Sequence, residues 1–378
     1  MNILFYENIV NPESGGVQRV TYTLAREFTR QNCDNCYVAH YAYDDFADDS
    51  VFKGVLFCRN NSITLLEEYV IKNRIDVVIN QLARNCQVVK ILFEICQRYN
   101  VRLINCLHIS PNASMESCHH LSRFFLKDYF RAKIKHLILS VNRIDLKELR
   151  YSYQKSDKFV VLSPLYVKQI CDLLKVDGEK LVSIYNPLSF QNTTATNKEK
   201  IILVVARMKE NPKRVSLVLK IWELLQNKIP GWSLYLIGDG PQLSFYKELC
   251  EEKKLINVHF LGRQDPRPYY EKATMFLMTS AQEGFGMTLI EAQQFGVIPI
   301  AFDSPAVFGD IIINGENGFL VPEGNLKLFA NIITNIVSDD SLRNKISINA
   351  IKYSHQFTPN IIVNEWTRML TPLVAKAK

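Results

Sequence analysis

Two glutamates frame a glycine-containing loop in the second half of the chain. Residues 281–295 read AQEGFGMTLIEAQQF and follow the apolar run MFLMT. Glu283 falls in the loop, and Glu291 falls one turn into a helix that we expect to begin near Met287. The first N–H groups of a helix have no intrahelical partner and lie at the positive end of its dipole, which suits a phosphate. The loop glycines let such a ligand approach the backbone because they carry no Cβ.

Two carboxylates beside a phosphate would repel it, by about 4 kcal/mol for charges 4 Å apart at intermediate dielectric. The conflict disappears if the carboxylates bind neutral hydroxyls, because a carboxylate can accept two hydrogen bonds from a vicinal diol. One glutamate on a ribose, the other on a second sugar and a diphosphate between them describe a nucleotide-sugar. Taken singly, Glu283 and Glu291 would be interpreted as a loop charge and a helix N-terminal charge.

Positive charge for such a ligand lies upstream, where the predicted strand Ile201–Val205 runs into ARMKENPKRV. Arg207 can bind phosphate oxygens with its planar fork, and Lys213 supplies a point charge. When a glycosidic bond to a nucleotide breaks, the leaving diphosphate gains charge, so donors placed there stabilise the transition state. Spacing leaves open whether Lys213 or Arg214 takes this role, and a solvated basic turn is the alternative interpretation.

The elements that must position these groups are those of an ordinary globular chain. It has 378 residues, 47% of them hydrophobic and 22% charged, which excludes a disordered or fibrous protein and favours about two domains.

No apolar run reaches the roughly 18 residues of a membrane span, and the N-terminus has no basic region typical of a signal peptide. The nine cysteines are scattered through apolar stretches, and we read the C-x-x-C at 33–36 as chance spacing. We therefore expect a reduced, cytoplasmic location.

Short β-branched runs alternate with amphipathic helical segments, which predicts an α/β fold with parallel sheets. The predicted strands are Asn2–Tyr6, Cys36–Tyr41, Asp76–Asn80, Arg102–Leu107, Phe159–Leu162, Val182–Tyr185, Ile201–Val205, Leu234–Ile237, Val258–Leu261, Met275–Met278, Pro299–Phe302 and Phe319–Val321. A polar Asn/Thr-rich stretch after Pro187 predicts a linker at 188–198 between two doubly wound domains, 1–187 and 199–356. Thr358 and Pro359 predict the start of a last helix within 357–378.

The segment EGFGMTLIEA resembles the E-x7-E motif of retaining glycosyltransferases of the GT-B fold, specifically glycosyltransferase family 4. The resemblance covers essentially the whole chain. Further motifs that agree with this family, in its order, are GGVQR at 15–19, Asn186-Pro187, Arg207 with Lys213, IGDGP at 237–241, VHFLGR at 258–263 and ENGFLVP at 316–322. The resemblance implies two Rossmann-like domains facing across a cleft, with the last helix crossing back onto the N-terminal domain. We interpret the glycines of IGDGP as turn geometry rather than as ligand contacts.

The resemblance also implies the roles of individual residues. Glu283 matches the glutamate near the transferred sugar, Glu291 the one on the ribose diol, and His108 a histidine near the sugar. The catalytic residues it implies are Glu283, Arg207, Lys213 and His108. The donor-binding residues it implies are Gly15, Gly16, Arg207, Lys213, Arg263, Glu283, Gly284, Phe285, Gly286, Met287, Thr288 and Glu291. No D-x-D pair, which metal-dependent glycosyltransferases use, occurs in the chain, so we predict no metal and no cofactor besides the nucleotide-sugar donor.

A basic stretch at 121–155 carries a formal charge of +6, nearly all of the net charge of +7. The cations that repeat along one predicted amphipathic helix are Arg123, Lys127, Arg131 and Lys135. This pattern is compatible with a helix packed on its own domain, and also with docking on the anionic inner face of a membrane, where a lipid-linked acceptor could be reached. Nucleic-acid binding is disfavoured because no recognition motif accompanies the cluster.

These observations favour an enzyme that moves a sugar from a nucleotide-diphosphate donor to a glycan or lipid-linked acceptor, in cell-surface polysaccharide biosynthesis. Retention of the anomeric configuration comes from the resemblance alone. The alternatives are a nucleotide-sugar epimerase of the same fold and a non-catalytic, nucleotide-sugar-binding partner subunit.

Overall fold

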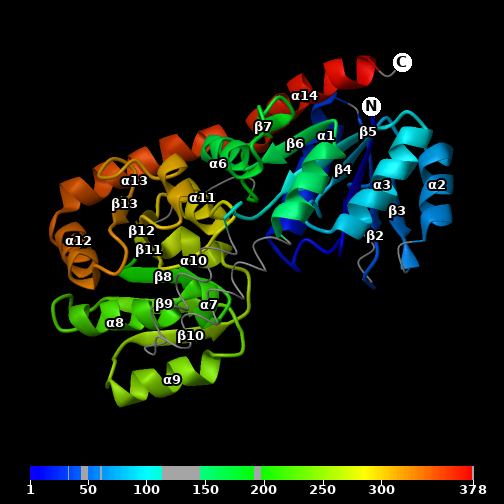
Figure 1. Cartoon of the computed structure of the whole chain (residues 1–378). Helices are drawn as coiled ribbons and strands as arrows, with labels where there is room; N and C mark the ends of the chain where they lie inside the picture. Colours follow the sequence, from blue (N-terminus) through cyan, green and yellow to red (C-terminus); the bar gives the residue numbers. More distant parts are fainter. Residues whose placement is uncertain (33, 44–49, 60–61, 113–144, 191–196, 377–378) are drawn as a thin grey trace. The chain divides into compact units, whose positions relative to one another are not determined.

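The computed structural model describes residues 1–32, 34–43, 50–59, 62–112, 145–190 and 197–376. Internal contacts divide the chain into two compact units (Figure 1), each described here by itself. The first unit comprises residues 1–189 together with 357–378, and the second comprises residues 190–356. No helix among the described residues is long and apolar enough to cross a membrane.

The first unit contains a seven-stranded sheet in the order β3-β2-β1-β4-β5-β6-β7, in which all neighbours are parallel. Its strands are β1 (Asn2–Glu7), β2 (Asn35–His40), β3 (Gly54–Phe57), β4 (Val77–Asn80), β5 (Arg102–Leu107), β6 (Lys158–Val161) and β7 (Leu181–Ser183). The strand order reverses direction between β1 and β4, and the carboxyl ends at such a switch point are the usual ligand site of doubly wound sheets.

The described part of the first unit contains several helices, three of which begin at a capping side chain (Ser62, Asn85 and Ser163). The helices are α1 (Gly16–Asn32), α2 (Ile63–Lys72), α3 (Cys86–Arg98), residues 145–154, α6 (Pro164–Leu174) and α14 (Pro359–Ala375). Asn85 caps α3 by accepting from the N–H of Val88, and α14 begins at the predicted Pro359. Ile362, Trp366 and Leu370 of α14 are buried, and Arg102 Nε donates to the carbonyl of Leu373 at 3.1 Å. The last helix therefore packs on the first unit, against α1, as the resemblance implies.

The second unit contains a six-stranded parallel sheet in the order β10-β9-β8-β11-β12-β13, with its switch point between β8 and β11. Its strands are β8 (Ile201–Val205), β9 (Ser233–Ile237), β10 (Val258–Gly262), β11 (Met275–Met278), β12 (Ile298–Phe302) and β13 (Phe319–Val321). Its helices are α7 (Glu210–Lys213), α8 (Val215–Leu225), α9 (Leu243–Glu252), α10 (Arg267–Lys272), α11 (Met287–Gln294), α12 (Leu326–Ser338) and α13 (Asp340–Ser354), with 3-10 turns η2 (Ala306–Asp310) and η3 (His355–Phe357), the latter spanning the boundary between the two units.

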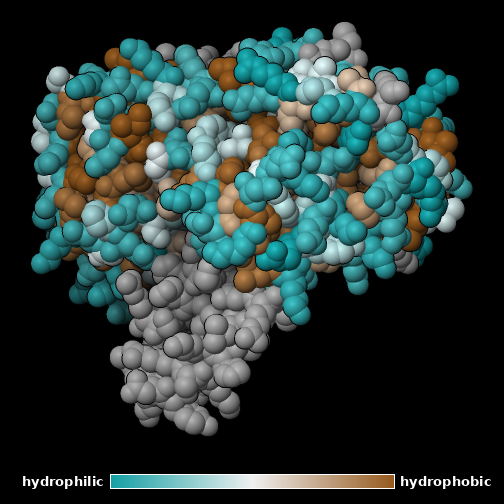
Figure 2. All heavy atoms as spheres, turned by 45° about the horizontal axis from the view of Figure 1, so that its top comes forward, coloured by the Kyte–Doolittle hydropathy of each residue, from teal (hydrophilic) through white to brown (hydrophobic). Residues whose placement is uncertain are grey.

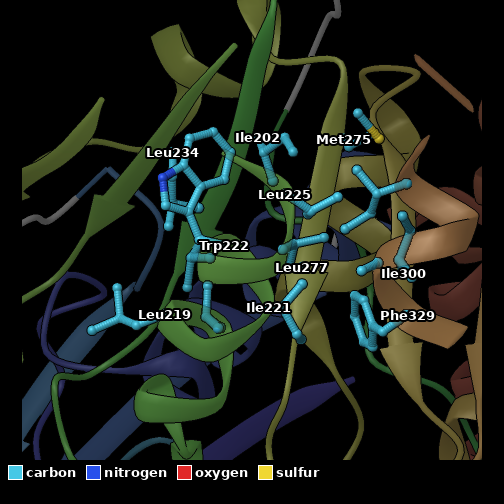
Figure 3. Packing of buried hydrophobic residues seen from close by; sticks show 14 of the residues in the cluster. Ile202, Leu219, Ile221, Trp222, Leu225, Leu234, Met275, Leu277, Ile300 and Phe329 are labelled. Atoms are coloured by element: carbon cyan, nitrogen blue, oxygen red, sulfur yellow. The ribbon is translucent and has the colours of Figure 1, made fainter. Parts of the chain in front are cut away.

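The core of the second unit lies where α8 and α12 cover the sheet (Figure 3). Trp222 of α8 is buried against this core, and its indole Nε1 donates to the carbonyl of Ile256 at 2.8 Å, so its one polar atom is satisfied. Hydrophilic and scattered hydrophobic residues share the face drawn in Figure 2, which is normal for a globular surface. A well-packed sheet holds the loops at its carboxyl edge in fixed positions.

The predicted fold class is confirmed: both units are doubly wound parallel sheets covered by helices. The twelve predicted strands all form, and only β3 lacks a counterpart in the prediction. This strand has four residues at the edge of the first sheet, and none of them is fully buried. A short, half-exposed strand has a weak hydrophobic pattern, which explains why the sequence did not indicate it.

Candidate functional site

Two oppositely charged side chains meet at the switch point of the second sheet. Lys213 ends the short helix α7 after β8, and Glu283 lies in the loop after β11. Lys213 Nζ lies 2.5 Å from Glu283 Oε1, and both side chains remain partly exposed, at 25% and 15%. A small pocket at this point is lined by both residues, by Thr279 and Ser280, and by the ends of β8 and β11. The structure thus brings together the predicted cation and the predicted sugar-binding glutamate.

Arg214, the alternative to Lys213, points elsewhere. Its Nε donates to the carbonyl of Thr279 at 2.7 Å, and its Nη1 lies 2.6 Å from Glu323 Oε1. Its guanidinium carbon also lies 5.5 Å from the ring centroid of Phe302. Arg214 therefore fastens the ends of β11 and β13 to the turn that carries Lys213, and Lys213 is the residue that faces Glu283.

A half-buried carboxylate that the sequence did not single out holds that turn in place. Glu210 begins α7, and its Oε1 accepts from the hydroxyl of Ser216 at 2.5 Å. Its Oε2 accepts from the hydroxyl of Tyr246 at 2.9 Å. These bonds tie α7 to α8 and α9, so that Lys213 projects from a braced turn.

Helix α11 begins at Met287, as predicted, with Gly286 as its N-cap. Gly286 has φ +109°, and a Cβ there would lie 3.1–3.3 Å from Phe308, Leu289 and Ile311, so glycine is required. No side chain caps the helix. Its first N–H groups, including those of Met287 and Thr288, therefore have the geometry that binds an anion. Phe285 is buried beside them and anchors the loop.

Glu291 is placed differently from Glu283. It lies one turn into α11, and only 1% of its surface is exposed. The hydroxyl of Tyr270 donates to Glu291 Oε2 at 3.3 Å, and the Tyr270 ring stacks on Phe295 with centroids 5.8 Å apart. The carboxylate is therefore oriented from inside the unit.

Of the remaining predicted residues in this unit, Arg207 is exposed in the loop directly after β8. Arg263 is exposed after β10, the edge strand, with β9 between that strand and β8. Among the described residues that line the switch-point pocket, Arg263 is not found. Arg207 and the first residues of α11 are not among them either, so of the predicted site residues that the structure describes this pocket brings together Lys213 and Glu283.

The predicted residues of the first unit lie at the carboxyl edge of its own sheet. Gly15 and Gly16 stand at the start of α1 after β1, and a Cβ at Gly16 would meet nothing within 4 Å. His108 follows β5 and lines a pocket of about 650 Å³ together with Val17 and Gln81. Open space at Gly16 is compatible with the expected close approach of a ligand.

Burial lowers the pKa of His108 to about 4, so its ring is neutral at neutral pH. Gln81 Nε2 donates to Thr21 Oγ1 at 3.0 Å, which leaves Gln81 Oε1 facing His108 Nε2 at 2.5 Å. The neutral imidazole then carries its proton on Nε2. His108 Nδ1 is buried and has no hydrogen-bond partner in the described part of the chain.

Sequence reasoning also missed Glu7, which ends β1 at the switch point of the first sheet. It is 1% exposed, and burial raises the pKa of its carboxyl to about 8. Thr21 and Gln18 of α1 face this carboxyl without a well-aligned hydrogen bond to either oxygen. An acidic residue that ends an otherwise apolar strand could have indicated this position.

The basic residues Arg123, Lys127, Arg131 and Lys135 lie outside the described residues. Asp145 is the first described residue after them, in the helical segment 145–154, and its carboxylate pairs with Arg84 at 2.7 Å.

Comparison with known proteins gives the chain a set of relatives. It is 32% identical over 210 residues to the capsular polysaccharide biosynthesis glycosyltransferase CapM of Staphylococcus aureus, over 54% of this chain and 52% of that protein. The chain spans about half the length of the curated relatives it matches.

Two solved structures share its fold over nearly their whole length. One is the lipopolysaccharide outer core galactosyltransferase WaaB, at a TM-score of 0.72 and 18% identity, covering 99% of this chain and 100% of that one. The other is HepE of Anabaena in complex with UDP and glucose, at a TM-score of 0.75 and 17% identity, covering 98% and 100%. At these identities the likeness concerns the fold, which is GT-B. The family model of the glycosyl transferases group 1 matches residues 186–353, the part of the chain that contains β8 to β13.

Proposed function

We propose that the chain is a retaining glycosyltransferase that takes a sugar from a nucleotide-diphosphate donor. The observation that carries the proposal is the pairing of Lys213 with Glu283 beside the start of α11. At one switch point, a cation and an uncapped helix start suit the diphosphate of such a donor, and a carboxylate suits its sugar hydroxyls.

In this proposal the donor binds to Lys213 and Glu283, either alongside their ion pair or by separating the two side chains. The donor offers each member of the pair a replacement partner, the diphosphate for Lys213 and sugar hydroxyls for Glu283, which offsets the separation of the two side chains. Lys213, Arg207 and the first N–H groups of α11 then bind the diphosphate and stabilise the charge that it gains as the glycosidic bond breaks. Glu283 accepts hydrogen bonds from the transferred sugar, and Glu291 accepts from the ribose diol.

The mechanism follows the resemblance. The acceptor hydroxyl attacks on the face from which the nucleotide leaves, through an oxocarbenium-like transition state, and the leaving phosphate takes the acceptor's proton. The positive charge in this scheme comes from the chain itself, so we propose that transfer requires no metal.

The acceptor we propose is a glycan or a lipid-linked sugar in cell-surface polysaccharide assembly. Support comes from CapM, which is named for capsular polysaccharide biosynthesis. UDP-glucose is the first donor to test, because HepE was solved with UDP and glucose. We further propose that the basic stretch brings a cytoplasmic enzyme to an anionic membrane; co-sedimentation with vesicles that does not depend on anionic lipid would contradict this.

The test is nucleotide release from UDP-, GDP-, ADP- and CDP-sugars, with and without bacterial glycan acceptors. We expect one donor to release its nucleotide in the presence of EDTA, and NMR of the product to show the donor's anomeric configuration. Conversion of the donor sugar without transfer would indicate an epimerase. Binding of a donor without turnover, with any acceptor, would indicate a non-catalytic partner.

A further inference from the structure

The turn Gly238-Asp239-Gly240-Pro241 lies against the loop that carries Arg207. It follows β9, which is the neighbour of β8 in the sheet. The N–H of Ala206 donates to the carbonyl of Ile237 at 3.0 Å, and the N–H of Met208 donates to the carbonyl of Asp239 at 2.9 Å. The N–H of Gln242 donates back to the carbonyl of Met208 at 3.0 Å. Three backbone bonds thus hold the residues on both sides of Arg207.

The two loops lie so close together that neither glycine of the turn could carry a side chain. A Cβ at Gly238 would lie 1.9 Å from the carbonyl oxygen of Ala206, and Gly238 has φ +135°. A Cβ at Gly240 would lie 2.5 Å from the carbonyl oxygen of Met208 and 2.9 Å from its nitrogen. The opposing atoms belong to the backbone, so rotating a side chain cannot relieve the clash. An alanine at either glycine must push the loop away.

Displacing the loop displaces Arg207. Met208 is fully buried in the core of the second unit, whereas Arg207 beside it is exposed. The buried neighbour and the three backbone bonds therefore decide where the Arg207 side chain leaves the backbone. The turn itself offers no side-chain cation, and the carboxylate of Asp239 accepts from the N–H of Gly240 at 2.7 Å, within the turn.

We propose that Gly238 and Gly240 are positioning residues, which set the backbone of Arg207 so that its guanidinium reaches the diphosphate of the donor. This inference rests on the proposed function, because it takes Arg207 as a diphosphate ligand. It assigns a purpose to the glycines other than contact with the ligand: they allow two loops at the carboxyl edge of the sheet to share backbone hydrogen bonds.

The experiment compares Gly240→Ala and Gly238→Ala with Gly231→Ala. Gly231 lies in the same unit, also has a positive φ, at +80°, and has nothing within 4 Å of a built Cβ, so it serves as a glycine without the clash. The probe is UDP, or whichever of UDP, GDP and ADP binds the wild-type chain, measured by calorimetry. We expect Gly240→Ala to weaken binding about 10-fold, and Gly231→Ala to leave it within 2-fold.

The decisive step places Gly240→Ala in an Arg207→Ala background. If the turn acts through Arg207, Gly240→Ala should weaken nucleoside diphosphate binding by less than 2-fold in this background, because the side chain that the turn positions is absent. An undiminished 10-fold loss would overturn the proposal, since the turn would then bind the ligand or support the site in another way. Wild-type affinity of Gly240→Ala would overturn it as well.

A milder variant keeps the proposal testable if the alanine variants do not fold. Asp239→Ala removes the bond to the N–H of Gly240 and loosens the turn without a clash. We expect a 2- to 5-fold loss of binding that disappears in the Arg207→Ala background, and equal losses in both backgrounds would contradict the inference. Failure of the wild-type chain to bind any nucleoside diphosphate would instead count against the proposed function.

Discussion

Arg214 and Glu323 lie 109 residues apart in the chain, yet Arg214 Nη1 and Glu323 Oε1 are 2.6 Å apart. Their side chains are 12% and 26% exposed, so this pair is about as shielded from water as the Lys213–Glu283 pair, and the difference lies in the cation. Lys213, the neighbour of Arg214, is more exposed and faces Glu283 instead. Two adjacent cations therefore have different tasks: one fastens loops, and the other is available to a ligand.

Arg214→Met is expected to lower the free energy of unfolding by about 1.5–3 kcal/mol, because it breaks charged hydrogen bonds of a nearly buried group. Lys213→Met, a matched loss of one cation, is expected to change stability by less than ~1 kcal/mol and to weaken nucleoside diphosphate binding about 10-fold. Thermal unfolding and calorimetry measure both quantities. The assignment is wrong if the two variants exchange these effects.

Glu283→Gln is expected to leave folding and nucleoside diphosphate affinity nearly unchanged and to lower kcat by 10-fold or more. The amide keeps the shape of the side chain but loses the charge that accepts from sugar hydroxyls in the transition state. Steady-state kinetics with the donor that the wild-type chain uses give kcat, and calorimetry gives the affinity for the nucleoside diphosphate. Unchanged kcat would show that Glu283 does not face the transferred sugar.

Glu291→Ala is expected to weaken donor binding and turnover together, because it removes the proposed ligand of the ribose diol. Tyr270→Phe is the informative companion, since it removes the hydroxyl that donates to Glu291 Oε2 and keeps the carboxylate. We expect a smaller loss of affinity for Tyr270→Phe, and a 2′-deoxynucleotide donor should reduce the difference between wild type and Glu291→Ala. If donor affinity and turnover both stay intact in Glu291→Ala, the diol assignment is wrong.

Glu7→Gln is expected to stabilise the protein increasingly as the pH rises. The pKa of this carboxyl is raised from 4.5 to about 8 by burial, so between these values the folded chain binds more protons than the unfolded chain. The free energy of unfolding therefore falls from pH 5 to pH 8, by ~1.4 kcal/mol for each unit of separation and a few kcal/mol at most. The variant removes this loss, which scanning calorimetry across pH would detect. Glu68→Gln, at an exposed position of α2, is the control, and the same pH trend in both variants would contradict the assignment.

His108→Asn is expected to change how the free energy of unfolding depends on pH below neutrality. The effect of His108 has the opposite sign to that of Glu7. The pKa of His108 is lowered from 6.5 to about 4 by burial, so between these values the unfolded chain binds more protons than the folded chain. Stability is therefore lost as the pH falls from 6.5 to 4, and the variant should lose less over that range. His355→Asn, at an exposed position, should show no such difference. Parallel stability curves for wild type and His108→Asn would refute this expectation.

The sequence determined the elements of this protein and the kind of group at the end of each. Apolar runs such as Ile201–Val205 and Met275–Met278 form strands at the predicted bounds, because their hydrophobic pattern is a local property of the chain. The Thr358-Pro359 start and the helix start at Met287 were equally readable, since caps and glycine turns act within a few residues.

Only the tertiary structure decided which of these groups meet. Whether Lys213 or Arg214 faces Glu283 depends on Thr279 and Glu323, which lie in the loops after β11 and β13. The burial of Glu7 and the space that Gly240 leaves for Met208 likewise depend on neighbours far along the chain. Spacing in the sequence determines which residues are neighbours within one helix or strand. The direction, burial and pKa of a side chain depend on residues from other elements, which the order of the strands in the sheet places next to it.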